Sequence, residues 1–269
     1  MSAAARFARD NELAEARMEL RLARFAVPAA LVVAWAVDHT DLGAFFVRTF
    51  FGMWLHELGH AVAAWLTGYP AVPLPWFTSV GSERSFLFAL AITAGLGYAI
   101  WRGWTNDDRT LTVIAAAVLV GQLFGTVILR PGTAHTWIIF SGDAGGLVLG
   151  ALCMAAFFTP PDHKLHRDWL RWGLVVIGAA SFVDAVHGWW DARRNIDAIV
   201  FGEIEDRADT DPTVLLQAGW SVDQMVFRYL ALAFVSLVAL AVLQYFHVRR
   251  TRAALEELEA DVEPERQSA

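Results

Sequence analysis

The chain has 269 residues and a formal net charge of −7; 56% of its residues are hydrophobic and only 18% are charged. Soluble globular domains carry about 25% charged residues, so this composition, with a mean hydropathy of +0.42, is typical of a protein that crosses a membrane several times. The acidic balance argues against nucleic acid as a partner. The single cysteine, Cys153, excludes an internal disulfide and a cysteine-rich zinc site.

The apolar runs predict an all-α polytopic membrane protein with six or seven transmembrane helices. We expect residues 1–24 to form a charged surface helix, residues 25–247 to form the transmembrane domain, and residues 248–269 to form a charged tail. No small-residue cleavage site follows the first apolar run, so we expect that run to be retained as an anchor. The expected spans are 25–37, 42–66, 85–101, 111–129, 147–158, 169–190 and 225–247.

The first expected span ends in Asp38, His39 and Asp41. These side chains can bind a metal, but polar clusters at span ends are usually solvated, and the pattern favours a turn at the membrane interface.

The second span holds the sequence FGMWLHELGHAVAAWL, in which His56, Glu57 and His60 interrupt an apolar run. Residues four apart on a helix lie about 40° apart in azimuth, so the two imidazoles can grip one ion. Glu57 lies about 100° round from His56, where its carboxylate can reach a water on that ion. Ionisable groups are costly within lipid, so this turn predicts a zinc site for hydrolysis. The alternative is a set of polar residues that hydrogen-bond between helices.

Three prolines, Pro70, Pro73 and Pro75, follow this span and predict an extended loop. Apolar side chains persist in the loop, so we expect it to be re-entrant and to lie next to the metal site. An exposed edge there can hold a substrate by strand addition. In the next two spans, the pairs Ala91 with Gly95 and Gly121 with Gly125 predict close helix packing.

Asp143 stands where a Pro- and Gly-containing stretch, expected to be irregular, gives way to the fifth span. Two neutral histidines and one carboxylate would leave a fourth position for water, the usual arrangement of a catalytic zinc site. The alternative for Asp143 is an N-cap of the fifth helix.

Asp184 and His187 lie one turn apart in the sixth span. They can support a metal ligand, form a proton path or pair with each other, or they can lie at the interface. Residues 191–223 form an acidic loop that contains no recognisable metal motif.

The motif HELGHAVAAWLTG, with the proline-rich loop and a distant Asp before another apolar run, resembles the site-2 protease family of intramembrane zinc metallopeptidases. The resemblance covers residues 42–158. It implies one Zn²⁺ per chain, metal ligands His56, His60 and Asp143, and a catalytic Glu57. The family carries an Asn eight residues before its Asp; His135 stands there and is expected to donate to an oxyanion. The chain departs from the family in having Asp-Ala-Gly-Gly for Asp-Gly-Gly and no Asn-Pro element.

We therefore expect a membrane-embedded zinc metalloendopeptidase that cleaves a membrane-protein or membrane-associated peptide substrate. The rivals are a noncatalytic zinc-binding or helix-packing membrane protein and, less favoured, a transporter. We expect a multi-pass protein of the cell membrane with a cytoplasmic N-terminus. Arginines flank both ends of the transmembrane domain, and an odd number of spans cannot place both clusters on one side.

Overall fold

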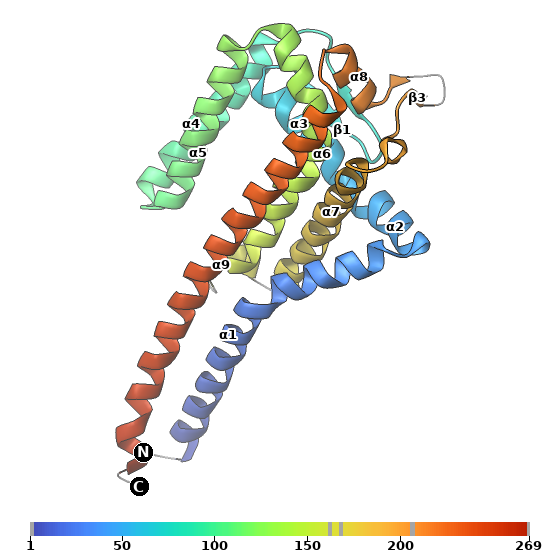
Figure 1. The fold of residues 1–269 in the computed structure, drawn as a ribbon. Helices are drawn as coiled ribbons and strands as arrows, with labels where there is room; N and C mark the ends of the chain where they lie inside the picture. The colour runs from blue at the N-terminus through green and yellow to red at the C-terminus, as the bar shows by residue number, and fades with distance from the viewer. Residues whose placement is uncertain (1–2, 161–162, 167–168, 205–207, 268–269) are drawn as a thin grey trace.

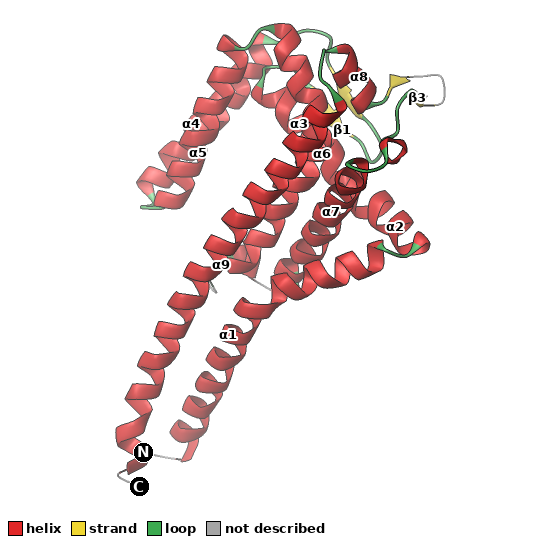
Figure 2. Cartoon of the chain, in the orientation of Figure 1, coloured by secondary structure: helices red, strands yellow, loops and turns green. Residues whose placement is uncertain are grey.

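The computed structural model describes residues 3–160, 163–166, 169–204 and 208–267. Helices make up nearly all of it, and the strands form two short hairpins (Figure 2). The predicted all-α membrane fold is confirmed, because six helical segments in this described part are long and apolar enough to cross a bilayer. These segments are Phe7–Asp38, Phe86–Thr105, Arg109–Ile128, Pro131–Phe158, Leu170–Ala192 and Val222–Asp261.

The first and last helices are longer than predicted. Helix α1 runs without a break over Ala3–Asp38, so the expected surface helix and first span are one element, and α9 (Val222–Gln267) absorbs most of the expected tail. Figure 1 shows that the two helices bring the chain ends side by side. Beyond the bundle they are joined by an ion pair between Arg17 and Glu259 at 2.7 Å and by a small cluster around Leu13 and Leu255. An even number of crossings by these six candidate segments would place both ends on one side of a membrane and would remove the conflict between the two arginine clusters.

The expected second span is helical throughout but contains a π-helical turn. It consists of α2 (Asp41–Val47), the π turn η1 (Arg48–Gly52) and α3 (Met53–Leu66). It is not among the six candidate spans, because His56, Glu57 and His60 lower its mean hydropathy. The helical structure predicted for 42–66 is confirmed, and its crossing of the membrane stays a prediction.

The stretch before residue 147 is helical, contrary to the expectation of irregular structure. Helix α6 covers Pro131–Ala155, with Pro131 in its first turn, where a missing N–H costs nothing. Asp143 therefore lies in the middle of a helix, and its predicted alternative role as an N-cap is wrong. A 3₁₀ turn, η3 (Ala156–Phe158), extends the helix, and η4 (Lys164–His166) follows it.

Helices α4 (Phe86–Thr105) and α5 (Arg109–Leu123, continued by the π turn η2, Phe124–Ile128) form an antiparallel pair at the edge of the molecule. Only 11% and 17% of their apolar windows are buried by protein. Their exposed apolar side chains suit a lipid environment.

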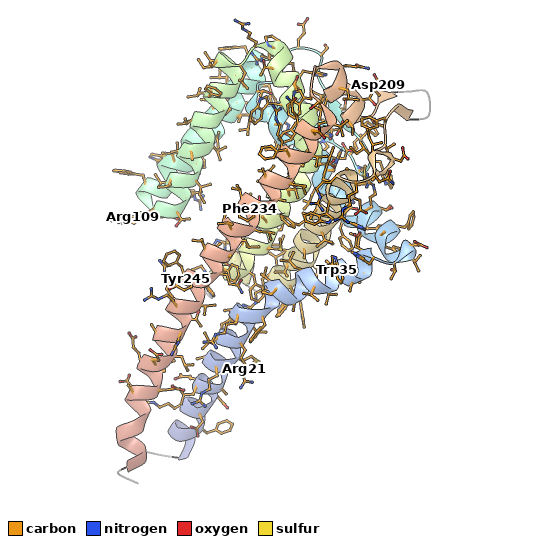
Figure 3. All side chains as sticks on the ribbon, in the orientation of Figure 1. Arg21, Trp35, Arg109, Asp209, Phe234 and Tyr245 are labelled. Carbon is orange, nitrogen blue, oxygen red and sulfur yellow. The ribbon has the colours of Figure 1, made fainter. Side chains whose placement is uncertain are left out.

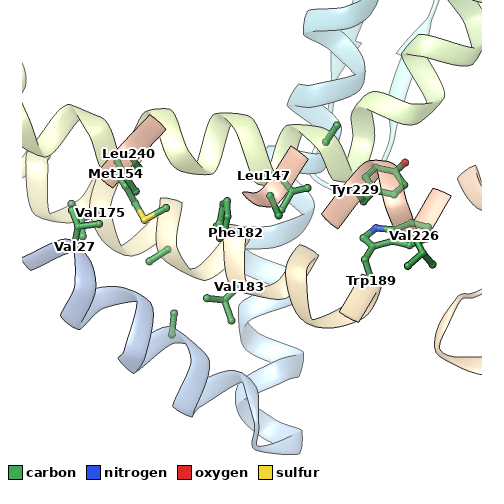
Figure 4. Packing of buried hydrophobic residues seen from close by; sticks show 14 of the residues in the cluster. Val27, Leu147, Met154, Val175, Phe182, Val183, Trp189, Val226, Tyr229 and Leu240 are labelled. Atoms are coloured by element: carbon green, nitrogen blue, oxygen red, sulfur yellow. The ribbon is translucent and has the colours of Figure 1, made fainter. Parts of the chain in front are cut away.

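The core lies between α1, α6, α9 and α7 (Leu170–Ala192), as Figure 4 shows for Val27, Leu147, Phe182 and Leu240. Trp189 stacks on Tyr229 at a centroid distance of 4.2 Å and joins α7 to α9. Large apolar side chains cover the outside as well, such as Phe234, which is 69% exposed (Figure 3). This surface is typical of helices in contact with lipid.

The proline-rich loop forms an antiparallel hairpin of β1 (Ala71–Pro73) and β2 (Thr78–Val80), in which Val72 pairs with Ser79. It packs on α3, and its tip exposes Trp76 and Phe77. The loop is thus beside the predicted metal site, as expected. Between α7 and α9 lie η5 (Ile196–Ala198), β3 (Glu203–Ile204), β4 (Ala208–Asp209) and α8 (Asp211–Gln217).

Candidate metal centre

The candidate site lies where α3 crosses α6, and glycines bring the two helices together. A Cβ atom on Gly59 would lie 2.0 Å from the carbonyl oxygen of Ser141, and one on Gly145 would lie 2.6 Å from the Cα of Gly59. Neither position tolerates a side chain unless the helices separate. The close approach brings the HELGH turn of α3 directly against the backbone of α6.

His56 and His60 face each other across this crossing, with their Nε2 atoms 3.1 Å apart. His60 Nδ1 donates to the carbonyl oxygen of Ile138 at 2.7 Å, and His56 Nδ1 donates to Asp143 Oδ1 at 2.9 Å. Both acceptors lack a hydrogen, so the protons of neutral rings lie on Nδ1. Each Nε2 then presents a lone pair to the other.

The carboxylate that joins the two imidazoles is Asp211, the first residue of α8. Its Oδ2 atom lies 3.2 Å from His56 Nε2 and 3.1 Å from His60 Nε2. This oxygen is buried, and no donor of the described residues is aligned to hydrogen-bond with it. Three electron-rich atoms therefore converge within 3.2 Å, an arrangement that either a proton on an imidazole or a bound metal ion would stabilise.

The spacing and chemistry of these three atoms fit a zinc ion. Tetrahedral zinc with nitrogen and oxygen ligands at about 2.0–2.1 Å separates them by about 3.3 Å. Two imidazoles and one carboxylate are a common catalytic zinc set with one position left for water. Gly142 of α6 leaves the space for the ion, because its Cβ would lie 2.7 Å from both Asp211 Oδ2 and His56 Nε2.

Asp143, the third ligand expected from the family resemblance, lies behind His56 instead. Both of its oxygens are engaged: Oδ1 by His56 Nδ1, and Oδ2 by the indole N–H of Trp189 at 2.8 Å. A carboxylate on the far nitrogen of a metal-binding histidine fixes the ring and its tautomer. The structure thus gives Asp143 the geometry of an orienting residue, and Asp211 takes the place expected for it.

Asp211 is held in place by its neighbours in α8. Leu215, one turn further along, is fully buried in the core, and Thr210, the N-cap, is also buried. Burial opposes the ionised carboxylate, but hydrogen bonds and positive charge from the His56 and His60 rings, when these are protonated, outweigh burial and hold the pKa of Asp211 well below its ordinary value. Asp211 is therefore a carboxylate at neutral pH.

Glu57 is 5% exposed and is positioned by the hairpin. Thr78 of β2 places its hydroxyl 2.8 Å from Glu57 Oε2 and 2.7 Å from the Glu57 carbonyl oxygen. Trp65 of α3 donates to the carbonyl oxygen of Ala71 at 2.9 Å, a second link between the hairpin and the helix. The proline-rich segment thus fixes the carboxylate predicted to act as a base.

His135 is not brought into this constellation. It is exposed near the start of α6, about 12 Å along the helix axis from Asp143 at 1.5 Å per residue. Among the described residues, no hydrogen bond joins it to Glu57 or to either imidazole of the site. Its role at an oxyanion stays a prediction.

A small cavity of about 10 Å³ borders His56 and Asp143, and its described lining includes neither His60 nor Asp211. It has room for one water and is also lined by Arg48, Ser181 and Asp184. Ser181 Oγ is buried without a hydrogen-bond partner, so a water there would satisfy it. Asp184 therefore lies near the site through this cavity and is separated from the metal position by His56.

Sequence reasoning missed Asp211 altogether. It is one of eight acidic residues in the 191–223 loop, and its flanking residues, Thr210 and Pro212, are those of any helix start. No local pattern distinguishes it from Asp209, whose carboxylate accepts a hydrogen bond from Gln217 at 2.8 Å. Only the fold brings it to the histidines.

Comparison of the chain with protein-family models, with curated proteins and with solved structures finds no match.

Proposed function

We propose that the protein is a membrane-embedded zinc metalloendopeptidase that hydrolyses a peptide bond in or near a transmembrane segment of its substrate. The observation that carries the proposal is the convergence of His56 Nε2, His60 Nε2 and Asp211 Oδ2 within 3.2 Å, with Glu57 in the same helical turn. Buried ionisable groups of this kind in an apolar helix bundle are costly and point to function.

His56, His60 and Asp211 would hold the zinc ion. When bound, zinc acidifies a water and polarises a carbonyl group. Asp143 would keep His56 in the required tautomer, with Trp189 holding the second carboxylate oxygen. Glu57 would take a proton from the attacking water and return it to the leaving amine.

The β1–β2 hairpin would hold the substrate. A transmembrane helix hides its carbonyls in internal hydrogen bonds, so the segment to be cleaved must become extended. A two-stranded hairpin offers an unpaired outer edge to which such a segment can add, and β2 places Thr78 against Glu57. An added strand would therefore lie beside the base. The membrane supplies the remaining environment of the site.

The first test compares cells that express the wild-type protein, Glu57→Gln or Glu83→Gln. New N-termini within transmembrane segments of host proteins are identified by mass spectrometry. We expect them with the wild type and with Glu83→Gln, which changes an exposed glutamate near the hairpin, and not with Glu57→Gln. The proposal fails if the Glu57→Gln profile equals that of the wild type, and a noncatalytic metal protein then becomes the better account.

The second test identifies the third ligand through zinc affinity. At the HELGH site, we expect Asp211→Asn to abolish zinc binding, Asp143→Asn to weaken it about 10- to 100-fold, as for other residues that orient a ligand, and Asp209→Asn to leave it unchanged. Competition with a chelating dye measures each affinity. Full zinc binding by Asp211→Asn together with its loss in Asp143→Asn would instead support the ligands that the family resemblance implies, His56, His60 and Asp143.

A further inference from the structure

A second cluster of histidine and aspartate side chains lies at the C-terminal ends of α1 and α7. Asp38, His39 and His187 each offer a ligand atom, and these atoms lie within 4.8 Å of one another. Asp38 is 3% exposed, so it is buried rather than solvated as the sequence suggested. The cluster shares no residue with the HELGH site.

We propose that this cluster is a second site for a divalent transition metal such as Zn²⁺. The set of two imidazoles and a carboxylate is the same as in the HELGH site, and imidazole and carboxylate are suitable ligands for zinc. An ion bound there would clamp the end of α1 to α7.

The hydrogen bonds on the outer sides of the rings repeat those of the first site. His39 Nδ1 donates to the carbonyl oxygen of Trp35 at 2.9 Å, as His60 Nδ1 does to Ile138, so His39 Nε2 carries a lone pair. His187 contacts a carboxylate oxygen of Asp191 through Nε2 at 3.2 Å, as His56 contacts Asp143 through Nδ1. Each site thus has one histidine fixed by a carbonyl and one fixed by a carboxylate.

The inner side of His187 requires a positive charge. Its Nδ1 faces Asp38 Oδ2, while its Nε2 faces Asp191. A neutral ring has only one proton for two carboxylates, so one contact brings two lone pairs together. Either a second proton or a metal ion resolves this, and His39, whose ring is stacked on His187 at a centroid distance of 4.9 Å, offers a further nitrogen within 4.8 Å of the other two ligand atoms.

The two sites lie on different faces of α7. His187 belongs to the second cluster, and Trp189, two residues on, binds Asp143 behind the first site. Residues two apart on a helix point about 200° apart. The sites can therefore be emptied one at a time by mutation.

The test is a zinc count on purified full-length protein that carries no histidine tag, after chelation, addition of Zn²⁺ and desalting. We expect two ions per chain for the wild type, one for His56→Ala/His60→Ala, one for His39→Ala, and none when all three changes are combined. His163→Ala, an exposed histidine outside both clusters, should retain two.

His39 is exposed, so its loss should not prevent folding, and the ion retained by the HELGH site reports a folded protein. As a second readout, Zn²⁺ should raise the Tm of His56→Ala/His60→Ala but not that of the triple variant. A single ion in the wild type that is absent from His56→Ala/His60→Ala would overturn the proposal and assign that ion to the HELGH site, whereas a single ion that His56→Ala/His60→Ala retains would support the second site and count against the first.

Discussion

The crossing of α3 with α6 and the pair formed by α4 and α5 both contain glycines, but the glycines serve different purposes. At the first crossing, Gly59 and Gly145 touch the opposite backbone. In the second pair, Gly95 and Gly121 meet nothing within 4 Å of an added Cβ, so the close helix packing predicted from the four-residue spacing of Ala91 and Gly95 is not found at Gly95. Glycine spacing alone therefore does not identify a helix contact. Gly178 of α7 and Gly150 of α6 approach each other in a similar way, and the α3–α6 crossing is the one that carries the candidate metal ligands His56 and His60.

The largest effect should come from Gly59→Ala. A Cβ at 2.0 Å from the Ser141 carbonyl oxygen must push α3 away from α6, and overpacking of this kind costs about 3 kcal/mol or more when backbone has to move. Thermal unfolding in detergent measures this loss of stability, and the zinc content of the purified variant measures the effect on the site. Gly95→Ala is the matched control and should be neutral or slightly stabilising, by about 0.5–1 kcal/mol, because alanine favours a helix. Equal changes in stability for Gly59→Ala and Gly95→Ala would show that the two helix pairs do not differ in their need for glycine at these positions.

A smaller effect on the fold, but a decisive one on the site, is expected from Gly142→Ala. The new methyl group would lie against the ends of His56 and Asp211, in the space left for the ion. We expect loss of zinc binding at the HELGH site with a melting temperature close to that of the metal-free wild type. Gly132→Ala changes a glycine of the same helix with open space around it and should retain the metal. Normal zinc binding by Gly142→Ala would show that the ion position is elsewhere.

The smallest effect should come from Gly125→Ala in the π turn after α5. Its Cβ would lie 2.4 Å from the Leu66 carbonyl oxygen, where the outer helix pair touches the end of α3. Because this contact involves the last residue of α3 and not the HELGH turn, we expect a loss of about 1–2 kcal/mol, with zinc affinity unchanged. Gly121→Ala, one turn earlier, serves as the control in the same unfolding measurement. A loss of zinc in Gly125→Ala would mean that the outer pair supports the metal site.

The sequence predicted those parts of the site that depend on local spacing. His56, Glu57 and His60 belong to one helical turn, so helix geometry alone places them together. Asp211 could not be found in this way, because it reaches the histidines from the far end of the chain through the packing of Leu215 and the start of α8. The sequence also indicated Asp143, but which nitrogen of His56 it contacts depends on how α6 packs against α3.

For the fold, hydropathy located the six spans but misjudged where several helices begin and end. Pro131 suggested irregular structure before the fifth span, yet proline is well tolerated in the first turn, and α6 begins there. The charged segments at the two ends remain helical because α1 and α9 support each other through the Arg17–Glu259 pair and Leu255. The sequence of either end, taken alone, does not predict this mutual support.

The hydroxyl group of Thr78 has one hydrogen and two acceptors within reach, the carboxylate and the carbonyl oxygen of Glu57. When that hydrogen points to the carboxylate, it occupies a lone pair that the incoming water would otherwise use. When it turns to the carbonyl, the lone pair is released without any movement of the backbone. If Glu57 acts as proposed, rotation about the Cβ–Oγ bond of Thr78 would change how readily that carboxylate accepts a proton.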